Sequence, residues 1–326
     1  FPFLSIEDNP INHLQRARIA SNLRFKTKTL DIKNFTNKKK RIGYFSSDFY
    51  NHATMHLMQK VFELHDKTSF EIFIYSYGRY QDKVTEKLKN NVYIFRDVSM
   101  LTDEEIASQA RNDKLDIAID LKGFTRGTRL SIFAERVAKI QISYLGYPGS
   151  IGAKFIDYLI ADRTLIPEEY EKFYSEKIIY MPNIWNALSK PNNLPNIRND
   201  KEKNVFTFGS FNNFQKISLE TIKLWSKILN EKNSRLILKT STPFDNQKSK
   251  EILLKKFKIE KLDLKKIIVL DRKNTFEEHL DCYNKVDLSL DTFPYPGVTT
   301  SFQSWVMGVP VLTMKGFNFI FICQFS

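Results

Sequence analysis

The chain has 326 residues, about twice the length of a typical domain, so its length favours two units of about 150 residues over one large core. Hydrophobic residues make up 42% and charged residues 27% of the chain, which excludes the composition of a disordered protein. The net charge is +13, but the lysines are spread through stretches such as 248–266 and no basic patch alternates with aromatic residues, so nucleic acid is not an expected partner.

The segment INHLQRARIASNL, which begins at Ile11, predicts an amphipathic helix. From residue 38 to residue 182, short β-branched or aromatic runs alternate with amphipathic stretches, a pattern typical of βαβ units around a parallel sheet. Strands are predicted over 41–48, 70–77, 91–95, 115–121, 140–145 and 158–160. Helices are predicted over 55–65 and 102–112, the second with a capping box of Thr102 and Glu105.

Residues 183–204 are rich in Asn, Pro and charged residues, which indicates a connection between domains. A second series follows, with strands over 205–211, 235–239, 266–270, 287–290 and 309–314 and helices over 218–230, 246–257, 275–286 and 300–307. We therefore expect an α/β chain with an N-terminal helical segment (1–37), a first Rossmann-like domain (38–190) and a second one (191–326). The tail FNFIFICQFS could be a buried last strand, but it has no polar alternation and no cap, so we expect a truncated or altered terminus and an incomplete second domain.

A Gly/Pro loop joins the end of a strand to the start of a helix in DTFPYPGVTTSFQSWVMGVP (291–310). A helix N-terminus beyond the carboxyl end of a strand offers N–H groups and the positive end of the helix dipole, which suits a diphosphate. Gly297 lets the backbone approach a ligand closely, and Thr299 and Thr300 can add hydroxyl donors. The alternative is that the two threonines only cap the helix.

The segment FGSFNNFQKIS (208–218) has the same order of strand, polar loop and helix. Lys216 could neutralise a leaving diphosphate, and Asn213 could donate a hydrogen bond beside it. The alternative is a lysine that is simply solvated at the surface.

The segment SSDFYNHATMH (46–56) follows the first strand of the first domain and supplies Asp48, His52 and His56. A carboxylate and two imidazoles in one short turn are candidates for proton transfer, although a single histidine is more often structural. His52 and His56 have the spacing of metal ligands, but no third ligand is evident. Since the chain also lacks an Asp-x-Asp pair, which commonly holds a divalent ion against a diphosphate, we expect no metal and no other cofactor.

Several segments in order resemble the O-linked N-acetylglucosamine transferase family, including its bacterial and SPINDLY-like relatives. They are RIGYFSSDFYNHATMHLMQ (41–59), LKGFTRGTR (121–129), ISYLGYPGSIGAKFIDYLIAD (142–162), YSEKIIYMPN (174–183), FGSFNNFQKIS (208–218), and LSLDTFPYPGVTT (288–300) with WVMGVPVLT (305–313). The resemblance runs from about residue 41 to residue 316. It implies a GT-B fold, in which two Rossmann-like domains with parallel sheets face a central cleft and the second holds most of the nucleotide donor.

The resemblance also implies roles for single residues. His52 corresponds to the histidine near the donor sugar and the acceptor, Lys216 to the diphosphate-binding lysine, and His279 to the histidine that packs against the uracil. Asn213 stands where the family usually has Gln. Other donor-binding positions by resemblance are Leu145, Gly146, Pro148, Thr299 and Thr300.

The chain departs from the family pattern at three further positions. Gln303 replaces an acidic residue that accepts hydrogen bonds from the ribose, so we expect weaker donor binding. Val298 replaces a histidine or glycine, and Phe276 stands where the animal enzymes have lysine.

The function implied by the resemblance is an inverting, metal-independent transfer of a sugar, most readily N-acetylglucosamine, from a UDP-sugar to Ser/Thr hydroxyls of a protein. His52, with Asp48, would orient or deprotonate the acceptor, and Lys216 would stabilise the leaving group. The alternatives are a fragment that binds nucleotide sugar without catalysis, and transfer of glucose or another sugar to a different acceptor. The family carries tetratricopeptide repeats before its catalytic region, and residues 1–37 would be the end of such a region.

The expected location is the cytoplasm. Cys282 and Cys323 do not have the spacing of a metal site or a disulfide framework, which fits a reducing compartment. No run of 18 apolar residues and no N-terminal leader occurs, so no membrane partner is expected.

Overall fold

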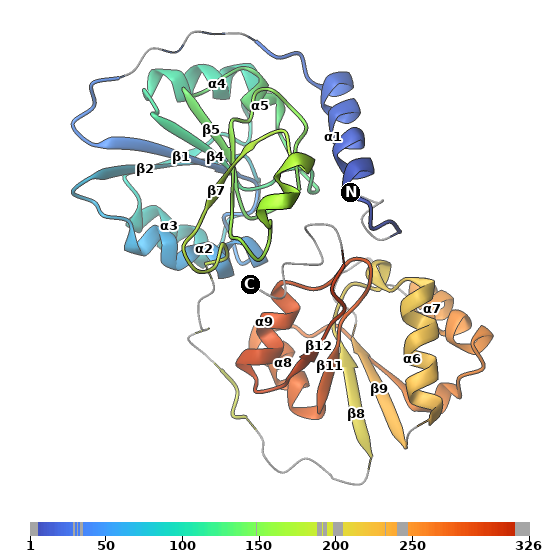
Figure 1. Cartoon of the computed structure of the whole chain (residues 1–326). Coiled ribbons are helices and arrows are strands. Elements are labelled where there is room, and N and C mark those ends of the chain that lie inside the picture. Colours follow the sequence, from blue (N-terminus) through green and yellow to red (C-terminus); the bar gives the residue numbers. More distant parts are fainter. Residues whose placement is uncertain are drawn as a thin grey trace. The chain divides into compact units, whose positions relative to one another are not determined.

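The computed structural model of the chain describes residues 6–28, 30, 32, 35–147, 149–187, 191, 194–197, 205–231, 233–239 and 247–316. The chain divides at residue 189 into two compact units, each built on one parallel sheet (Figure 1). The predicted α/β class is therefore confirmed. Pro148, Cys323 and the tail 317–326 lie outside the described residues, as does most of the predicted connection 183–204.

The first unit has a parallel sheet with the strand order β3-β2-β1-β4-β5-β6-β7. Its strands are β1 (Lys40–Ser46), β2 (Phe70–Ser76), β3 (Ile94–Asp97), β4 (Ile117–Asp120), β5 (Ile140–Ser143), β6 (Tyr158–Ala161) and β7 (Lys177–Tyr180). Its helices are α1 (Pro10–Arg24), α2 (Ala53–Leu64), α3 (Lys83–Asn91), α4 (Asp103–Asn112), α5 (Ser131–Ala134) and the 3-10 helix η2 (Glu168–Phe173).

Strand β1 is apolar on both faces because helices cover both faces of the sheet. The Tyr44 ring packs against Phe62 of α2, with 5.1 Å between ring centroids. The next residue, Phe45, packs at 5.1 Å against Phe133 of α5 and stacks at 4.3 Å on Tyr75 of β2. Successive residues thus point into opposite cores, which explains the uninterrupted apolar run in the sequence.

Helix α1 begins as its sequence directs. The Asn9 side chain accepts hydrogen bonds from the backbone N–H groups of Ile11 and Asn12, and Pro10 occupies the first helical position. The buried face includes Ser21, whose hydroxyl donates to the Ile151 carbonyl at 2.6 Å. This bond ties α1 to the loop after β5.

The structure differs from the predicted elements where polar helices interrupt the pattern. Helix α3 was not predicted, although Asp82 and Thr85 form a capping box at its start. It extends to Asn91, so the strand predicted over 91–95 begins only at Ile94. The helix predicted over 275–286 is a short α-helix followed by a 3-10 helix.

The second unit has a parallel sheet with the strand order β10-β9-β8-β11-β12. Its strands are β8 (Phe206–Ser210), β9 (Ser234–Lys239), β10 (Ile267–Leu270), β11 (Leu288–Leu290) and β12 (Val311–Leu312). Its helices are α6 (Leu219–Glu231), α7 (Gln247–Ile259), α8 (Phe276–Asp281) and α9 (Thr299–Val306), with the 3-10 helices η3 (Phe214–Lys216), η4 (Leu264–Lys266) and η5 (Cys282–Lys285).

Two cores lie on opposite faces of the second sheet. Leu236 and Leu238 of β9 pack with Trp225 of α6 and Phe257 of α7. The residue between them, Ile237, packs on the other face in a cluster that also holds residues of α8, η5 and the segment after α9. Figure 1 shows α6 and α7 on one side of the strands and α8 and α9 on the other.

The strand order reverses once in each sheet. In the first sheet this happens between β1 and β4, and in the second between β8 and β11. In open parallel sheets, ligands bind beyond the carboxyl ends of the strands at such a reversal point. The loops that follow these four strands are therefore the places to look for a site.

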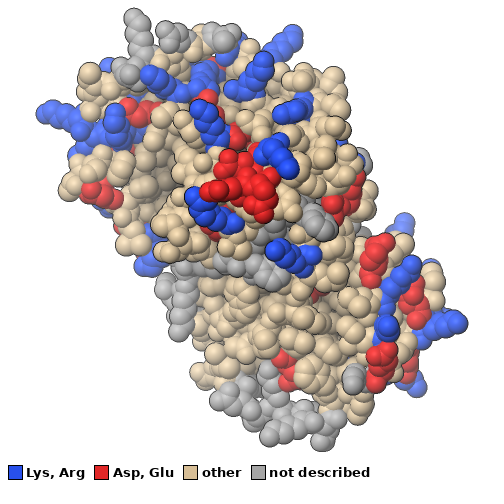
Figure 2. Space-filling view, viewed as in Figure 1, with Lys and Arg blue, Asp and Glu red and all other residues tan. Residues whose placement is uncertain are grey.

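The surface shows no continuous basic stripe on the face seen in Figure 2, where lysine and arginine side chains alternate with acidic ones over the first unit. Within the described ranges, every helix is too short or too polar to cross a bilayer.

Candidate functional site

At the reversal point of the second sheet, the Asp291 carboxylate connects three loops. Asp291 follows β11, and its Oδ1 accepts hydrogen bonds from the Gly297 backbone N–H at 2.8 Å and from Asn212 Nδ2 at 3.1 Å. Its Oδ2 accepts from the Thr313 hydroxyl at 2.9 Å. Burial raises the pKa of Asp291 to about 6, although these hydrogen bonds and the charge of Lys216 lower it.

Thr300 and Gly297 depend on each other's position. The Thr300 hydroxyl donates to Asn212 Oδ1 at 3.0 Å. A Cβ atom at Gly297 would lie 1.9 Å from Thr300 Oγ1, so only glycine permits this approach. Helix α9 begins at Thr299, with Val298 as its N-cap residue, and no side chain caps it. The alternative that the threonines only cap the helix is therefore wrong.

Lys216 is held against the loop that follows β11. Its Nζ donates to the Pro296 carbonyl at 3.0 Å and lies 4.0 Å from the centroid of the Tyr295 ring. The alternative of a simply solvated lysine is wrong as well. The side-chain oxygen of Asn213 accepts a hydrogen bond from the Gln215 backbone N–H at 2.9 Å, and the predicted donor role of its NH₂ group stays a prediction.

His279 and Gln303, predicted at the uracil and the ribose, lie together. His279 Nε2 is 2.8 Å from Gln303 Oε1. Since an amide oxygen only accepts, Nε2 is the donor. The imidazole also contacts Phe211 and Tyr283, with ring centroids 6.2 and 5.9 Å apart. Gln303 is buried, and its amide oxygen accepts a hydrogen bond from the imidazole.

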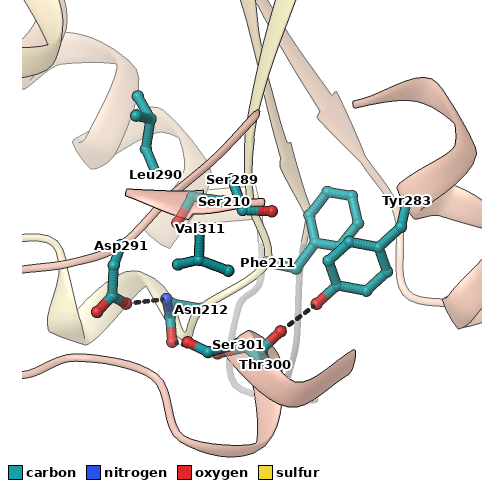
Figure 3. Close-up of a pocket in the computed structure, with 10 residues that line it drawn as sticks. All are labelled: Ser210, Phe211, Asn212, Tyr283, Ser289, Leu290, Asp291, Thr300, Ser301 and Val311. Atoms are coloured by element: carbon teal, nitrogen blue, oxygen red, sulfur yellow. Dashed lines mark hydrogen bonds between the residues drawn. The ribbon is translucent and has the colours of Figure 1, made fainter. Parts of the chain in front are cut away.

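A small pocket lies between the ends of β8 and β11 and the first turn of α9, with room for about one water molecule (Figure 3). Ser210, at the end of β8, lines it together with Asp291 and Thr300. The Ser210 hydroxyl is buried and has no hydrogen-bond partner among the described residues. It is a polar group that a bound molecule would satisfy.

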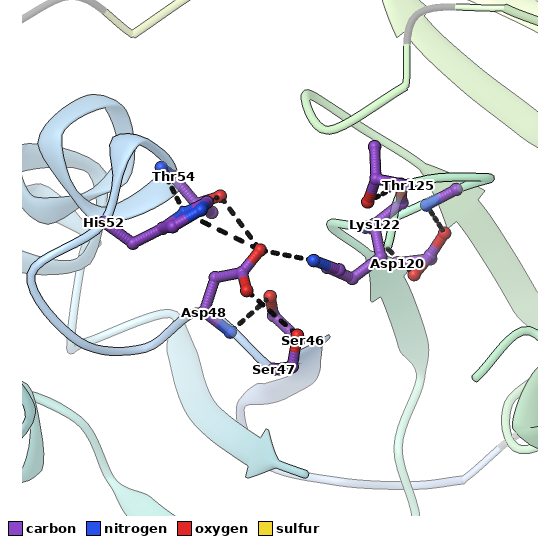
Figure 4. A network of polar contacts seen from close by, with 9 residues as sticks. Ser46, Ser47, Asp48, His52, Thr54, Asp120, Lys122 and Thr125 are labelled. Carbon is purple, nitrogen blue, oxygen red and sulfur yellow. Dashed lines mark hydrogen bonds and ion pairs between the residues drawn. The ribbon is translucent and has the colours of Figure 1, made fainter. Parts of the chain in front are cut away.

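At the reversal point of the first sheet, a buried ion pair joins the loops after β1 and β4 (Figure 4). Lys122 Nζ lies 2.6 Å from Asp48 Oδ2, and the two side chains are only 6% and 9% exposed. Asp120 accepts from the backbone N–H groups of Lys122 and Gly123 at 3.1 and 2.6 Å, and burial raises its pKa to about 6.

His52 is the N-cap residue of α2. Its Nδ1 accepts the backbone N–H of Thr54 at 3.2 Å and lies 3.7 Å from Asp48 Oδ2, which is too far for a hydrogen bond. The Thr54 hydroxyl oxygen also lies 3.1 Å from Nδ1. Because a backbone N–H only donates, its contact favours an unprotonated Nδ1 and a neutral ring with its proton on Nε2. Burial lowers the pKa of His52, while Asp48 raises it and Lys122 lowers it. This pattern favours a neutral ring whose Nε2 can donate a hydrogen bond.

His56 does not join this cluster. It lies one turn further along α2, and its Nε2 is 2.8 Å from Asn51 Oδ1. Burial and the neighbouring His52 lower the pKa of His56. His56 therefore contacts the loop that carries His52 through Asn51.

Leu145 and Gly146 lie beside the Lys122 loop. Leu145 has a φ of +68°, which is unusual for a residue other than glycine. A Cβ atom at Gly146 would lie 2.1 Å from the Leu121 carbonyl oxygen, so the loop after β5 packs directly on the loop after β4.

Sequence reasoning missed five polar residues in these two regions. They are Asp120, Lys122, Asn212, Ser210 and Asp291. Each lies at or directly after the end of a strand next to a reversal point, and this position is the signal that would have found them.

A larger cavity lies away from both reversal points. A cavity of about 890 Å³ lies between α1 and the amino-terminal ends of β5, β6 and β7, at the opposite edge of the first sheet. Among the described residues, no three His, Cys, Asp or Glu side chains form a group that could hold a metal ion.

Residues 13–200 match the model of glycosyl transferase family 41. The chain belongs to this family. It is 33% identical over 287 residues to the probable UDP-N-acetylglucosamine–peptide N-acetylglucosaminyltransferase SPINDLY of Solanum lycopersicum, an alignment that covers 84% of the chain and 30% of that protein. It is 36% identical over 204 residues to the probable enzyme SEC of Arabidopsis thaliana, covering 59% of the chain and 21% of that protein. The chain thus spans about a third or less of these relatives.

Among solved structures, the chain resembles a lysine-to-methionine variant of Thermobaculum terrenum O-GlcNAc transferase, with a TM-score of 0.90 and 29% identity over 99% of the chain and 62% of that protein. A glycosyltransferase of Rickettsia africae has a TM-score of 0.53 at 11% identity, covering 84% of the chain and 79% of that protein, and shares the fold alone. The predicted family and the GT-B class are confirmed.

Proposed function

We propose that the chain is the catalytic region of an inverting glycosyltransferase that moves a sugar, most readily N-acetylglucosamine, from a UDP-sugar to Ser/Thr hydroxyls of a protein. The family assignment supports glycosyl transfer. The names of the similar proteins, which are peptide N-acetylglucosaminyltransferases and an O-GlcNAc transferase, support this donor and a peptide acceptor.

The observation that carries the proposal is the position of Lys216 beside the start of α9. Lys216 follows β8, and its amine is fixed to the Pro296 carbonyl, two residues before the N-cap of α9. A lysine and a helix N-terminus at a strand reversal point supply two sources of positive potential for a diphosphate. The Thr300 hydroxyl and the unpartnered Ser210 hydroxyl add hydrogen-bonding groups at the same edge.

In the proposed reaction, the acceptor oxygen bonds to the anomeric carbon while the bond from that carbon to the diphosphate oxygen breaks. The nucleoside diphosphate leaves with the bonding electron pair, and Lys216 and the start of α9 stabilise its negative charge. The proton of the acceptor hydroxyl passes to an oxygen of the leaving diphosphate or to water. Attack from the face opposite the leaving group inverts the anomeric configuration. His279 and Gln303 would bind the uracil and ribose, and His52 would orient the reacting oxygen through Nε2.

The test compares Lys216→Met with Lys223→Met, which removes the same charge from an exposed position on α6. Transfer from UDP-N-acetylglucosamine to an acceptor protein is followed by intact mass, and UDP binding by calorimetry. We expect Lys216→Met to lower kcat by about 100-fold or more, the effect of removing one well-placed charge-stabilising group, and the control to leave it unchanged. Equal turnover of the two variants would remove Lys216 from the mechanism.

The same experiment separates the alternatives. A wild-type chain that binds UDP but transfers nothing is a nucleotide-sugar-binding fragment. The small pocket and the hydrogen bond of Lys216 to the loop after β11 are the observations that favour this second candidate. A screen of nucleotide sugars identifies the sugar, and the product mass identifies the acceptor.

A further inference from the structure

Lys122 has no role in the function proposed above, yet it is among the most buried charged side chains of the first unit. It lies two residues after β4, and Asp48 lies two residues after β1. Their ion pair therefore spans the reversal point of the sheet at a distance of 2.6 Å. Burying two charges costs solvation energy that such a pair does not always recover, so stability alone is weak grounds for its presence.

The pair decides which partner Asp48 engages. Asp48 Oδ2 contacts Lys122 at 2.6 Å and the Thr54 hydroxyl at 3.5 Å, whereas His52 Nδ1 is 3.7 Å away. In a catalytic arrangement of Asp and His, the carboxylate accepts a hydrogen bond from the N–H of one ring nitrogen, and the other nitrogen is free to act as a base. Here Lys122 pairs with the carboxylate, and His52 Nδ1 contacts Thr54 instead, with the backbone N–H at 3.2 Å and the hydroxyl oxygen at 3.1 Å.

We propose that Lys122 is a positioning residue that engages Asp48 and thereby keeps the His52 ring neutral with its proton on Nε2, as a hydrogen-bond donor. The His52 side chain is 39% exposed, so a ligand can reach the ring. The consequence for the reaction rests on the proposed function: His52 orients the sugar or the acceptor, and the acceptor proton passes to an oxygen of the leaving diphosphate or to water. The statement about the ring itself does not depend on any activity.

Other charged and titratable groups also face this region. They are Tyr50 and Asp82 beside the His52 loop, His56 on α2, and Tyr77 and Asp120 behind Asp48. All of them remain in the variants below. A change in the titration midpoint or tautomer of His52 can then be assigned to the Lys122–Asp48 ion pair.

The test measures the titration and tautomer of His52 by NMR of the chain labelled at its five histidines, with His52 assigned by His52→Asn. In the wild type we expect an unprotonated Nδ1. In Lys122→Met, Asp48 loses its partner, so the His52 midpoint moves to higher pH or the ring proton moves to Nδ1. In Asp48→Asn, where Lys122 remains without the carboxylate, the midpoint moves to lower pH. Lys122→Arg retains the charge and stays close to the wild type.

The signals of His65 and His279, which lie outside the network, report whether each variant is folded. If a folded Lys122→Met has the wild-type tautomer and midpoint, the pair is only structural and the proposal is wrong. If Lys122→Met does not fold, Asp48→Asn decides: an unchanged or higher His52 midpoint overturns the proposal. None of these outcomes requires donor or acceptor, so a failure of the proposed sugar transfer is recognised separately.

Discussion

Replacing Asp291 by Asn should stabilise the second unit at neutral pH. The carboxamide preserves all three hydrogen bonds of the carboxylate. Its oxygen can accept from the Gly297 N–H and from Asn212, and its NH₂ can donate to the Thr313 hydroxyl oxygen. What the substitution removes is the buried charge.

The magnitude follows from the raised pKa. Asp291 has a pKa of about 6 in the folded chain against an ordinary 3.8. The difference corresponds to about 3 kcal/mol. Because the folded chain holds this proton to higher pH than the unfolded chain does, it binds more protons between these two values. Stability from this group is therefore present below the lower pKa and is lost as the pH rises through the folded pKa.

The assay is urea unfolding from pH 4 to pH 8, followed by the fluorescence of the three tryptophans, of which Trp225 is buried in α6 of the second unit. We expect Asp291→Asn to match the wild type near pH 4 and to exceed it by up to about 3 kcal/mol above pH 7. Asp271→Asn, at an exposed position after β10, serves as the control and should show no such trend. A difference between Asp291→Asn and the wild type that is the same at every pH would refute the reasoning.

Two further substitutions test the loop that Asp291 organises. Gly297→Ala should weaken UDP binding about tenfold or more, since the new methyl group would displace the Thr300 hydroxyl, and calorimetry that finds an unchanged Kd would contradict this. Thr221→Val should cost about 1–3 kcal/mol of unfolding free energy, because the buried hydroxyl donates to the Phe293 carbonyl at 2.7 Å and accepts from its N–H at 3.1 Å. Urea unfolding with a wild-type midpoint would show that water replaces both bonds.

The sequence pattern predicted the helices and strands correctly where an element buries a regular set of apolar residues. The alternation of apolar runs placed β1, β2, β4 and β5 to within a few residues, and the Thr102/Glu105 capping box was found as predicted. Helix α3 was missed because its sequence, KVTEKLKNN, buries only Thr85 and Leu88 and contains only two apolar residues, Val84 and Leu88. Its capping residue Asp82 was the available signal.

Candidate site residues were easier to propose than their roles. Lys216, His52, Thr300 and Gly297 follow from polar loops after predicted strands and from the family resemblance. Whether a lysine is solvated or held, and which nitrogen of a histidine carries the proton, depends on partners that the local pattern does not specify. For Lys216 the partner is Pro296, 80 residues further along the chain.

The sequence by itself determined the two α/β units, the family and the loops in which chemistry is expected, because apolar periodicity, glycine and proline positions and motif order are local properties of the chain. Only the tertiary structure decided that Lys122 engages Asp48 across 74 residues and that Asp291 joins the loops after β8, β11 and β12. Parallel strands that are distant in sequence end at the same edge of a sheet, so the contacts that set the charge of His52 and the shape of the loop before α9 arise only when the sheet order is formed.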